Sequence, residues 1–331
     1  MMSPREPGTP GRTGGDGEAF AAFVARVMKP EADRVMAQKR TSLVHALLAG
    51  FVAFAVTFVA LYFASRPYLP SMSTYGISAW PILILLPATM AVIAASVTYL
   101  LSLRAAVKIF TDTVMGGLGE HIDPGIVHTS GRRISSAEMR ESLLVGEEPA
   151  ISSSGEHFRG RSGAATFEFC DTGFEARAPG AKDATRFSGL FFAAVLDKRF
   201  AAPLLSFPAH FPASLSAIAD SLRAAGIPFG ELVRTETDGL RQTISNADIS
   251  DPLAASFPPS ILDRICSEDT FQSASMSFSC LGNRFYAIAS APREVANRSG
   301  AIGGFDFGNS RNFCRWAALC LDMVDALSES R

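Results

Sequence analysis

The fold of this chain is decided by two apolar runs, SLVHALLAGFVAFAVTFVALYFAS (residues 42–65) and ISAWPILILLPATMAVIAASVTYLLSL (residues 77–103). Neither run contains an Asp, Glu, Lys or Arg residue. At a rise of about 1.5 Å per residue, a helix of either length crosses a hydrocarbon core of roughly 30 Å. A charged residue at a helix centre costs roughly 2.5–3.5 kcal/mol, so such long uncharged runs are typical of membrane spans. The sequence therefore predicts a transmembrane helical hairpin in a lipid bilayer, with a short external loop at residues 66–76.

Charges beside the two runs predict the orientation of the hairpin. Positive residues precede the first run and follow the second: Lys29, Arg34, Lys39, Arg40, Arg104 and Lys108. The loop between the runs carries only Arg66. By the positive-inside rule, both termini lie in the cytoplasm, and we expect a multi-pass protein of the bacterial inner membrane. A cleaved signal peptide is the alternative for the first run, but the run is too long and a second span follows at once.

Small residues in the first run indicate how the hairpin packs. Ala46 with Gly50, and Ala49 with Ala53, are spaced four apart and let a second helix approach closely. We expect this contact within the hairpin rather than at a dedicated dimer face, although a homo-oligomer stays open.

Three further segments flank the hairpin. Residues 1–17 are rich in Gly and Pro and are expected to form a disordered tail. Residues 18–41 carry Phe20, Phe23 and Val24 at helical spacing, interrupted at Pro30, and either lie on an anionic leaflet or dock onto the soluble domain. Residues 104–150 are predicted to form a juxtamembrane helix, ended by Gly116-Gly117 and Gly119, and a linker. In this linker, Ser135 begins a capping box and a short helix.

Residues 151–331 are predicted to form a cytosolic α+β domain with a mainly antiparallel sheet and packed helices. The predicted strands include the apolar run Leu190–Leu196, Leu204–Phe207, and a hairpin of 231–235 with 240–245. A strand around Phe167 is expected to turn at Asp171-Thr172-Gly173, and 149–163 is expected to be a loop. Helices are predicted at 213–225, 258–266 and 311–327.

The strictest alternation in the chain lies at residues 273–280, where serines alternate with Ala274, Met276, Phe278 and Cys280. Such alternation is typical of a half-buried antiparallel strand whose polar face meets water. We therefore expect the serine face of this strand to be wet.

The order of several motifs resembles that of a bacterial family of two-span membrane proteins with a cytoplasmic domain. The motifs are ISSAEMRES (residues 134–142), GEHFRGRSG (155–163), FSGLFF (187–192) with DKRF (197–200), and DPLAASFPP (251–259) before LDRI (262–265). On these residues the chain resembles the domain of unknown function 3137 family over most of residues 80–330. It departs at His157, where the family tends to carry Asp, and at Ala254-Ala255-Ser256. The resemblance implies an inner-membrane protein with a cytosolic α+β domain, and it implies no activity.

Composition and motifs exclude several classes of chemistry. The net charge is −2 and no basic stripe is present, so we expect no nucleic-acid partner. The five cysteines are scattered without CxxC spacing, which predicts reduced, buried thiols rather than a zinc or redox site. The sequence contains no HExxH, GxSxG or GK[ST]-type motif. We therefore expect no catalytic residue, no metal and no cofactor.

The segment GEHFRGRSG offers the candidate ligand site. Glycines together with His157, Arg159 and Arg161 can present backbone N–H groups and positive charge to a phosphate. Asp197, in a charged cluster with Lys198 and Arg199, completes the candidate set. The structural alternatives are a solvated loop for 155–163 and a charged turn for 197–199.

Two functions follow from different classes. The first is a membrane-anchored, non-catalytic binding or scaffold domain that takes a protein partner, and it calls for an open sheet edge or apolar patch without a deep polar pocket. The alternative is a membrane-bound enzyme or small-molecule sensor. In that alternative His157, Arg159 and Arg161, with Asp171 or Asp197, converge in one pocket for a phosphate-type ligand.

Overall fold

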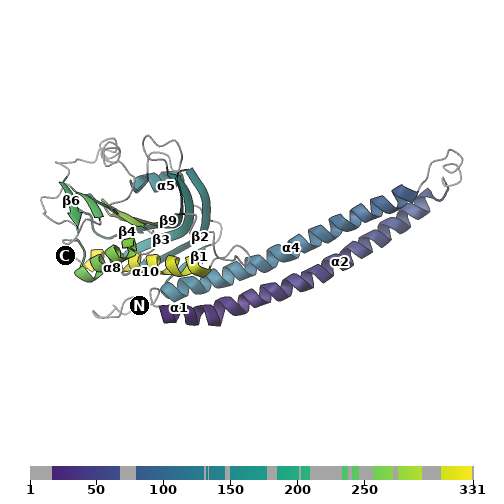
Figure 1. The fold of residues 1–331 in the computed structure, drawn as a ribbon, viewed down its shortest axis with the longest axis horizontal. Helices are drawn as coiled ribbons and strands as arrows, with labels where there is room; N and C mark the ends of the chain where they lie inside the picture. The colour runs from purple at the N-terminus through teal and green to yellow at the C-terminus, as the bar shows by residue number, and fades with distance from the viewer. Residues whose placement is uncertain are drawn as a thin grey trace. The chain divides into compact units, whose positions relative to one another are not determined.

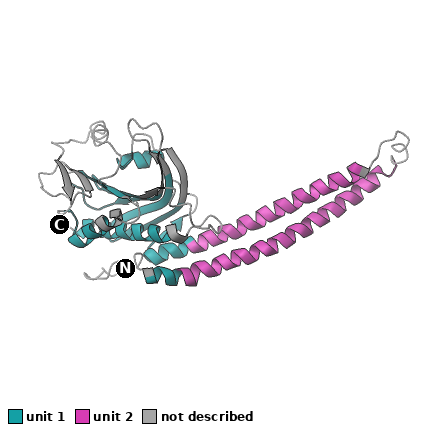
Figure 2. Cartoon of the chain, viewed as in Figure 1, with its two compact units in different colours: residues 1–23, 115–331 teal, residues 24–114 magenta. Residues whose placement is uncertain are grey.

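The computed structural model describes residues 17–67, 80–129, 132, 134–145, 150–176, 185–200, 203–208, 233–237, 241–245, 256–270, 275–292 and 307–329. The chain forms two compact units, one of residues 24–114 and the other of residues 1–23 and 115–331 (Figure 2). The predicted disordered tail, the external loop beyond residue 67 and the predicted helix at 213–225 lie outside the described residues.

The unit of residues 24–114 is a hairpin of long helices (Figure 1). A π-helical turn, η2 (Val24–Met28), leads from α1 (Gly17–Phe23) into α2 (Lys29–Ser65), and α4 (Trp80–Ile122) forms the return limb. The helix continues through Pro30, which lies in the first turn of α2, and the turn before it is π-helical. Both limbs are long and apolar enough to cross a membrane, and only 11% of the most apolar window of each is buried. The predicted hairpin of two long apolar helices is confirmed.

The two limbs meet through small residues, as predicted. Ala46 and Gly50 are buried, and a Cβ added to Gly50 would lie 3.0 Å from the carbonyl oxygen of Ala91 and 3.2 Å from Cβ of Ala95. A larger residue than glycine at position 50 would push the helices apart. Close packing of small residues is the usual basis of helix association in lipid.

The second unit is built on a sheet, which the described strands form in the antiparallel order β1-β2-β3-β4-β9-β8-β5-β7-β6. The strands are β1 (Val127–Thr129), β2 (Ala150–Ser162), β3 (Ala165–Ala176), β4 (Thr185–Val195), β5 (Leu204–Pro208), β6 (Val233–Thr237), β7 (Arg241–Ser245), β8 (Ser275–Leu281) and β9 (Arg284–Pro292). Helix α5 (Ser136–Glu141) lies on one side of the sheet, and α8 (Pro259–Thr270) and α10 (Phe307–Glu329) lie on the other (Figure 1). The predicted α+β class with an antiparallel sheet is confirmed.

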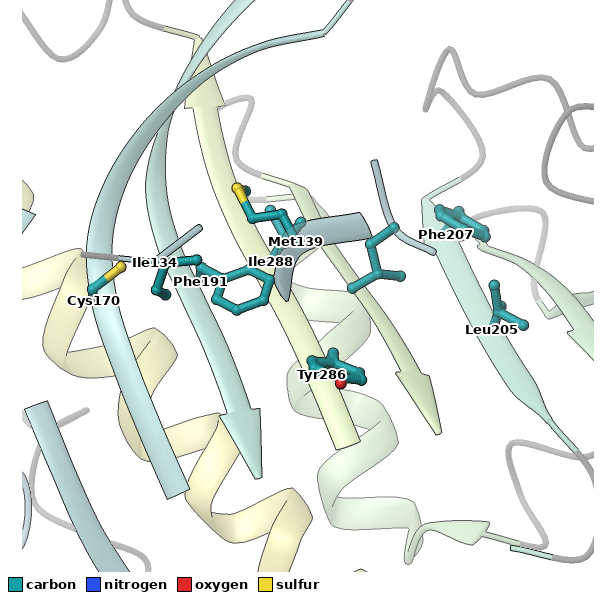
Figure 3. Close-up of a cluster of buried hydrophobic side chains, with 9 residues drawn as sticks. Ile134, Met139, Cys170, Phe191, Leu205, Phe207, Tyr286 and Ile288 are labelled. Atoms are coloured by element: carbon teal, nitrogen blue, oxygen red, sulfur yellow. The ribbon is translucent and has the colours of Figure 1, made fainter. Parts of the chain in front are cut away.

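Two apolar layers hold this unit together. On the side of α10, the rings of Phe158 and Phe169 stack at 5.0 Å between centroids, and each lies 5.6 Å from the ring of Phe313. On the other side, Met139 of α5 belongs to a cluster with side chains from β3, β4, β5 and β9 (Figure 3). The central strands therefore bury both of their faces along part of their length.

Helix α5 begins as the sequence predicts. The Ser135 side chain accepts a hydrogen bond from the backbone N–H of Glu138, and the Glu138 carboxylate accepts one from the backbone N–H of Ser135 at 2.7 Å. This reciprocal capping box stabilises a helix of only six residues, which nucleates poorly without such a cap.

Several local predictions are wrong. The expected loop at 149–163 is the thirteen-residue strand β2, and Asp171–Gly173 continues β3 instead of turning. Serine and glycine favour loops as isolated residues, but here the pairing of β2 with β3 and β1 satisfies the backbone. Helix α4 also continues through Gly116 and Gly119 to Ile122, because a cap needs more than a flexible residue.

The prediction of a wet serine face on residues 273–280 is wrong as well. The strand exists as β8, but Ser277 and Ser279 are 2% and 0% exposed. The hydroxyl of Ser279 donates a hydrogen bond to the backbone oxygen of Ser142 at 2.7 Å. The segment that follows α5 covers this face, and a hydrogen-bonded serine can be buried at little cost.

Residues at the start of the described chain dock within this unit. Phe20 and Phe23 are 6% and 3% exposed, and their rings lie 6.0 and 5.0 Å from the imidazole of His121. Of the two interpretations of residues 18–41, the structure therefore shows docking onto the protein for Phe20 and Phe23.

Candidate functional site

An open pocket of about 780 Å³ lies on the side of the sheet that carries α5. We call it the arginine pocket, because four arginines line it: Arg132, Arg159, Arg161 and Arg284. Its volume is typical of a site for a small organic molecule.

Strand register builds the pocket floor from two rows of side chains that cross β2, β3, β4 and β9. One row is Arg159, Glu168, Ala193 and Tyr286, and the other is Arg161, Thr166, Val195 and Arg284. Alternate residues of a strand point to the same face, so the two rows lie side by side. From β2 to β9 the floor is cationic at β2, polar at β3 (Glu168 and Thr166), apolar at β4 and polar again at β9.

Gly160 allows β2 to present Arg159 and Arg161 to the pocket. It faces the other side of the sheet, where a Cβ would come 2.5 Å from Cζ of Phe167. The Phe167 ring thus occupies the space of the missing side chain, an arrangement by which aromatic residues stabilise glycine in a strand. The glycine that suggested a loop is required by close packing.

Two of the four arginines are neutralised by carboxylates. Nη2 of Arg132 lies 2.8 Å from Oε2 of Glu168 and 3.7 Å from Oε1 of Glu138. At the β9 end, Nη1 of Arg284 donates to Glu141 at 2.9 Å and to the hydroxyl of Tyr286 at 3.0 Å. These contacts fix the rim of the pocket but leave little net charge there.

Arg159 and Arg161 differ from the other two. Both side chains are exposed, and neither forms an ion pair with any carboxylate of the described residues. Two neighbouring guanidinium groups repel each other, and an anion that bridges them relieves this repulsion. The β2 end of the pocket therefore has the charge and the donors to bind an oxyanion.

His157 is a buried neighbour of the pocket, in the next row of side chains on the same face of the sheet. It is 1% exposed, and its Nε2 atom lies 3.3 Å from Oε2 of Glu168. The interaction with His157 and the charge of Arg132 lower the pKa of Glu168, against the opposing effect of burial. Glu168 is thus ionised at neutral pH and links His157 to Arg132.

The structure brings together some of the residues predicted from the sequence. Arg159 and Arg161 share the pocket, and His157 lies two residues before Arg159 on the same face of β2. Asp197 is exposed in the bend after β4 and does not line the pocket. Asp171 alternates with Cys170 on β3 and faces the α10 side of the sheet. Neither aspartate contributes to the arginine pocket.

The sequence did not reveal the other polar residues that line the pocket, which are Arg132, Glu138, Glu168, Arg284 and Tyr286. They come from four segments other than β2, and β9 reaches the site only through its pairing with β4, in which Val195 lies opposite Arg284 and Ala193 opposite Tyr286. Alternation of polar with apolar residues in β3 and β9 was the available signal, but it does not reveal which strands are neighbours.

The tyrosine of the pocket is a neutral hydrogen-bonding group. Burial raises the pKa of Tyr286, so its phenol stays protonated near neutral pH. Among the described residues, no three His, Cys, Asp or Glu side chains are grouped so that they could hold a metal ion. The groups that face the pocket are hydrogen-bond donors and fixed charges.

Comparison with family models, with curated proteins and with solved structures finds no match to this chain, so its resemblance to the domain of unknown function 3137 family stays a prediction.

Proposed function

We propose that this is an inner-membrane protein, with both termini in the cytoplasm, whose cytosolic domain is a non-catalytic binding module for a small anionic ligand. The ligand binds in the arginine pocket, and the helical hairpin anchors the module to the bilayer. The observation that carries the proposal is the pair of exposed guanidinium groups, Arg159 and Arg161, in a pocket of about 780 Å³.

The pocket also favours this ligand-binding function over a protein scaffold. A scaffold would call for an apolar patch or an open sheet edge without a deep polar pocket. The β1 edge is a strand of only three residues, and the concave polar site lies elsewhere on the sheet. A short edge strand is a poor template for strand addition.

Calorimetric titration of the full chain in detergent with inorganic phosphate, at low salt, tests the anion site. We expect saturable binding that weakens at least about tenfold in an Arg159→Ala/Arg161→Ala double variant, because two charge-assisted contacts are lost. Arg199→Ala is the matched control, since Arg199 is exposed on the same unit but lies outside the pocket. Binding that is absent, or equal in all three proteins, contradicts the proposal.

Reporter fusions test the membrane part. A fluorescent protein after Arg331 should fold and fluoresce, and a periplasmic phosphatase at that position should stay inactive, because the flanking charges place this end in the cytoplasm. The opposite pattern, or recovery of the protein without detergent, contradicts the anchoring.

A further inference from the structure

The two rows of the pocket floor carry information on the ligand beyond its charge. Between the free arginines at β2 and the polar groups at β9 lie Ala193 and Val195 of β4, with the Val195 side chain 42% exposed in the pocket. An inorganic anion at β2 would leave this apolar middle uncovered. A ligand that also covers it gains the free energy of burying apolar surface.

We propose that the ligand is an organic phosphomonoester, with its phosphate held by Arg159 and Arg161 and a compact apolar body over Ala193 and Val195. This inference rests on the proposed function of the pocket and specifies its ligand class. The body has the size of one aromatic ring or a short branched alkyl group.

The pair of guanidinium groups selects phosphate over carboxylate. Each guanidinium offers a planar fork of donors, and one carboxylate has two oxygens that saturate one fork. The phosphate of a monoester has three terminal oxygens and a charge near −2 at neutral pH, so it can accept from both forks at once. Arg159 and Arg161 are two residues apart on one strand, roughly 7 Å between their Cα atoms, a spacing that one bridging phosphate can serve.

The spacing of the strands sets the size of the body. Strands β2 and β4 are separated by β3, so their backbones lie roughly 10 Å apart. The guanidinium–phosphate contact takes up part of this distance, which leaves room for about one ring before the polar end of the floor at Arg284 and Tyr286. Glu168 lies on β3, between β2 and β4, and its carboxylate already contacts Arg132 and His157. It therefore repels the phosphate less than a free carboxylate would.

The test compares three probes by calorimetry on the full chain in detergent: inorganic phosphate, phenyl phosphate and benzoate. We expect phenyl phosphate to bind about tenfold more tightly than inorganic phosphate, because the ring covers apolar surface of about two methylene groups. Benzoate, which has the ring without the phosphate, should bind more weakly than phenyl phosphate. Val195→Thr keeps the shape of the side chain but makes it polar, and it should reduce the preference for phenyl phosphate while leaving inorganic phosphate unchanged.

The outcomes separate this inference from the function on which it rests. Equal binding of inorganic phosphate and phenyl phosphate, or tighter binding of benzoate, overturns the ligand class while the anion site stands. An undiminished preference in Val195→Thr also overturns it, because the ring then lies elsewhere. If none of the three probes binds, the proposed function fails together with the inference.

Discussion

Replacing Gly160 by Ala tests whether the segment with the two free arginines is a packed strand. The added Cβ would lie 2.5 Å from Cζ and 3.0 Å from Cε2 of Phe167, and 3.1 Å from the carbonyl oxygen of Gly125. Phe167 is 4% exposed, and its ring lies 6.2 Å from Phe169 and 5.8 Å from Phe192. The ring therefore has little free space into which it can move, and the carbonyl oxygen of Gly125 crowds the added Cβ as well.

The size of the effect follows from two opposing terms. Overpacking of a tight core costs about 1–3 kcal/mol. Alanine also has less conformational freedom than glycine in the unfolded chain, which stabilises the folded state by about 0.4–1 kcal/mol. We expect a net loss of about 1–2 kcal/mol of unfolding free energy, which lowers the melting temperature by about 2–8 °C for a unit of this size.

Thermal unfolding of the full chain in detergent, followed by tryptophan fluorescence, measures this loss, because Trp316 is buried on α10. Gly116→Ala is the matched control: Gly116 lies in helix α4 with nothing within 4 Å of an added Cβ, so alanine should stabilise the helix by up to about 1 kcal/mol. A Gly160→Ala variant that is as stable as the wild type, or more stable, would refute the strand assignment, since alanine in an open loop is neutral or stabilising.

Three further results are expected. In a Cys266→Ser variant, a thiol reagent should label no residue of the native protein and four residues after denaturation. Burial raises the pKa of the four remaining thiols and blocks access to them; these are Cys170, Cys280, Cys314 and Cys320. Fast labelling of the native protein would show that this core is wrong. The folded state lowers the pKa of Glu168 below its ordinary 4.5, so its stabilisation is present above that pH and is lost as the pH falls through the folded pKa. The melting temperature of Glu168→Gln should consequently fall less steeply below pH 4.5 than that of the wild type, and parallel curves would exclude this role. In denaturant titrations, Ser135→Ala should lower the free energy of unfolding by about 1 kcal/mol, because the capping box is lost. Ser136→Ala, one residue inside the helix, should leave this free energy nearly unchanged. Equal effects of the two substitutions would argue against the cap.

The sequence predicted the parts of this fold that depend on composition and local periodicity. The two long apolar helices follow from their uncharged runs, and the cap at Ser135 and the strand Leu204–Phe207 follow from local patterns. The helical hairpin and its small-residue contact at Gly50 were accessible for the same reason.

The predictions that failed depend on tertiary contacts. The composition of β2 is that of a loop, and only the packing of Phe167 against Gly160 explains the glycine in a strand. The serines of β8 were expected to face water, but the segment after α5 covers them. The arginine pocket depends most on long-range pairing. The sequence singled out Arg159 and Arg161, but the apolar middle and the far end come from β4 and β9, whose pairing no local pattern reveals.

An anion-binding pocket should show in the reactivity of a cysteine placed in it, Val195→Cys, in the Cys266→Ser background. The anionic reagent 2-sulfonatoethyl methanethiosulfonate is compared with its trimethylammonium counterpart on the full chain at low salt. Because charged clefts reach potentials of several kT, we expect the anionic reagent to react at least about tenfold faster. This advantage should be lost in Arg159→Ala/Arg161→Ala and kept in Arg199→Ala. A cationic reagent that reacts as fast as the anion, or faster, would contradict an anion-binding pocket at this site.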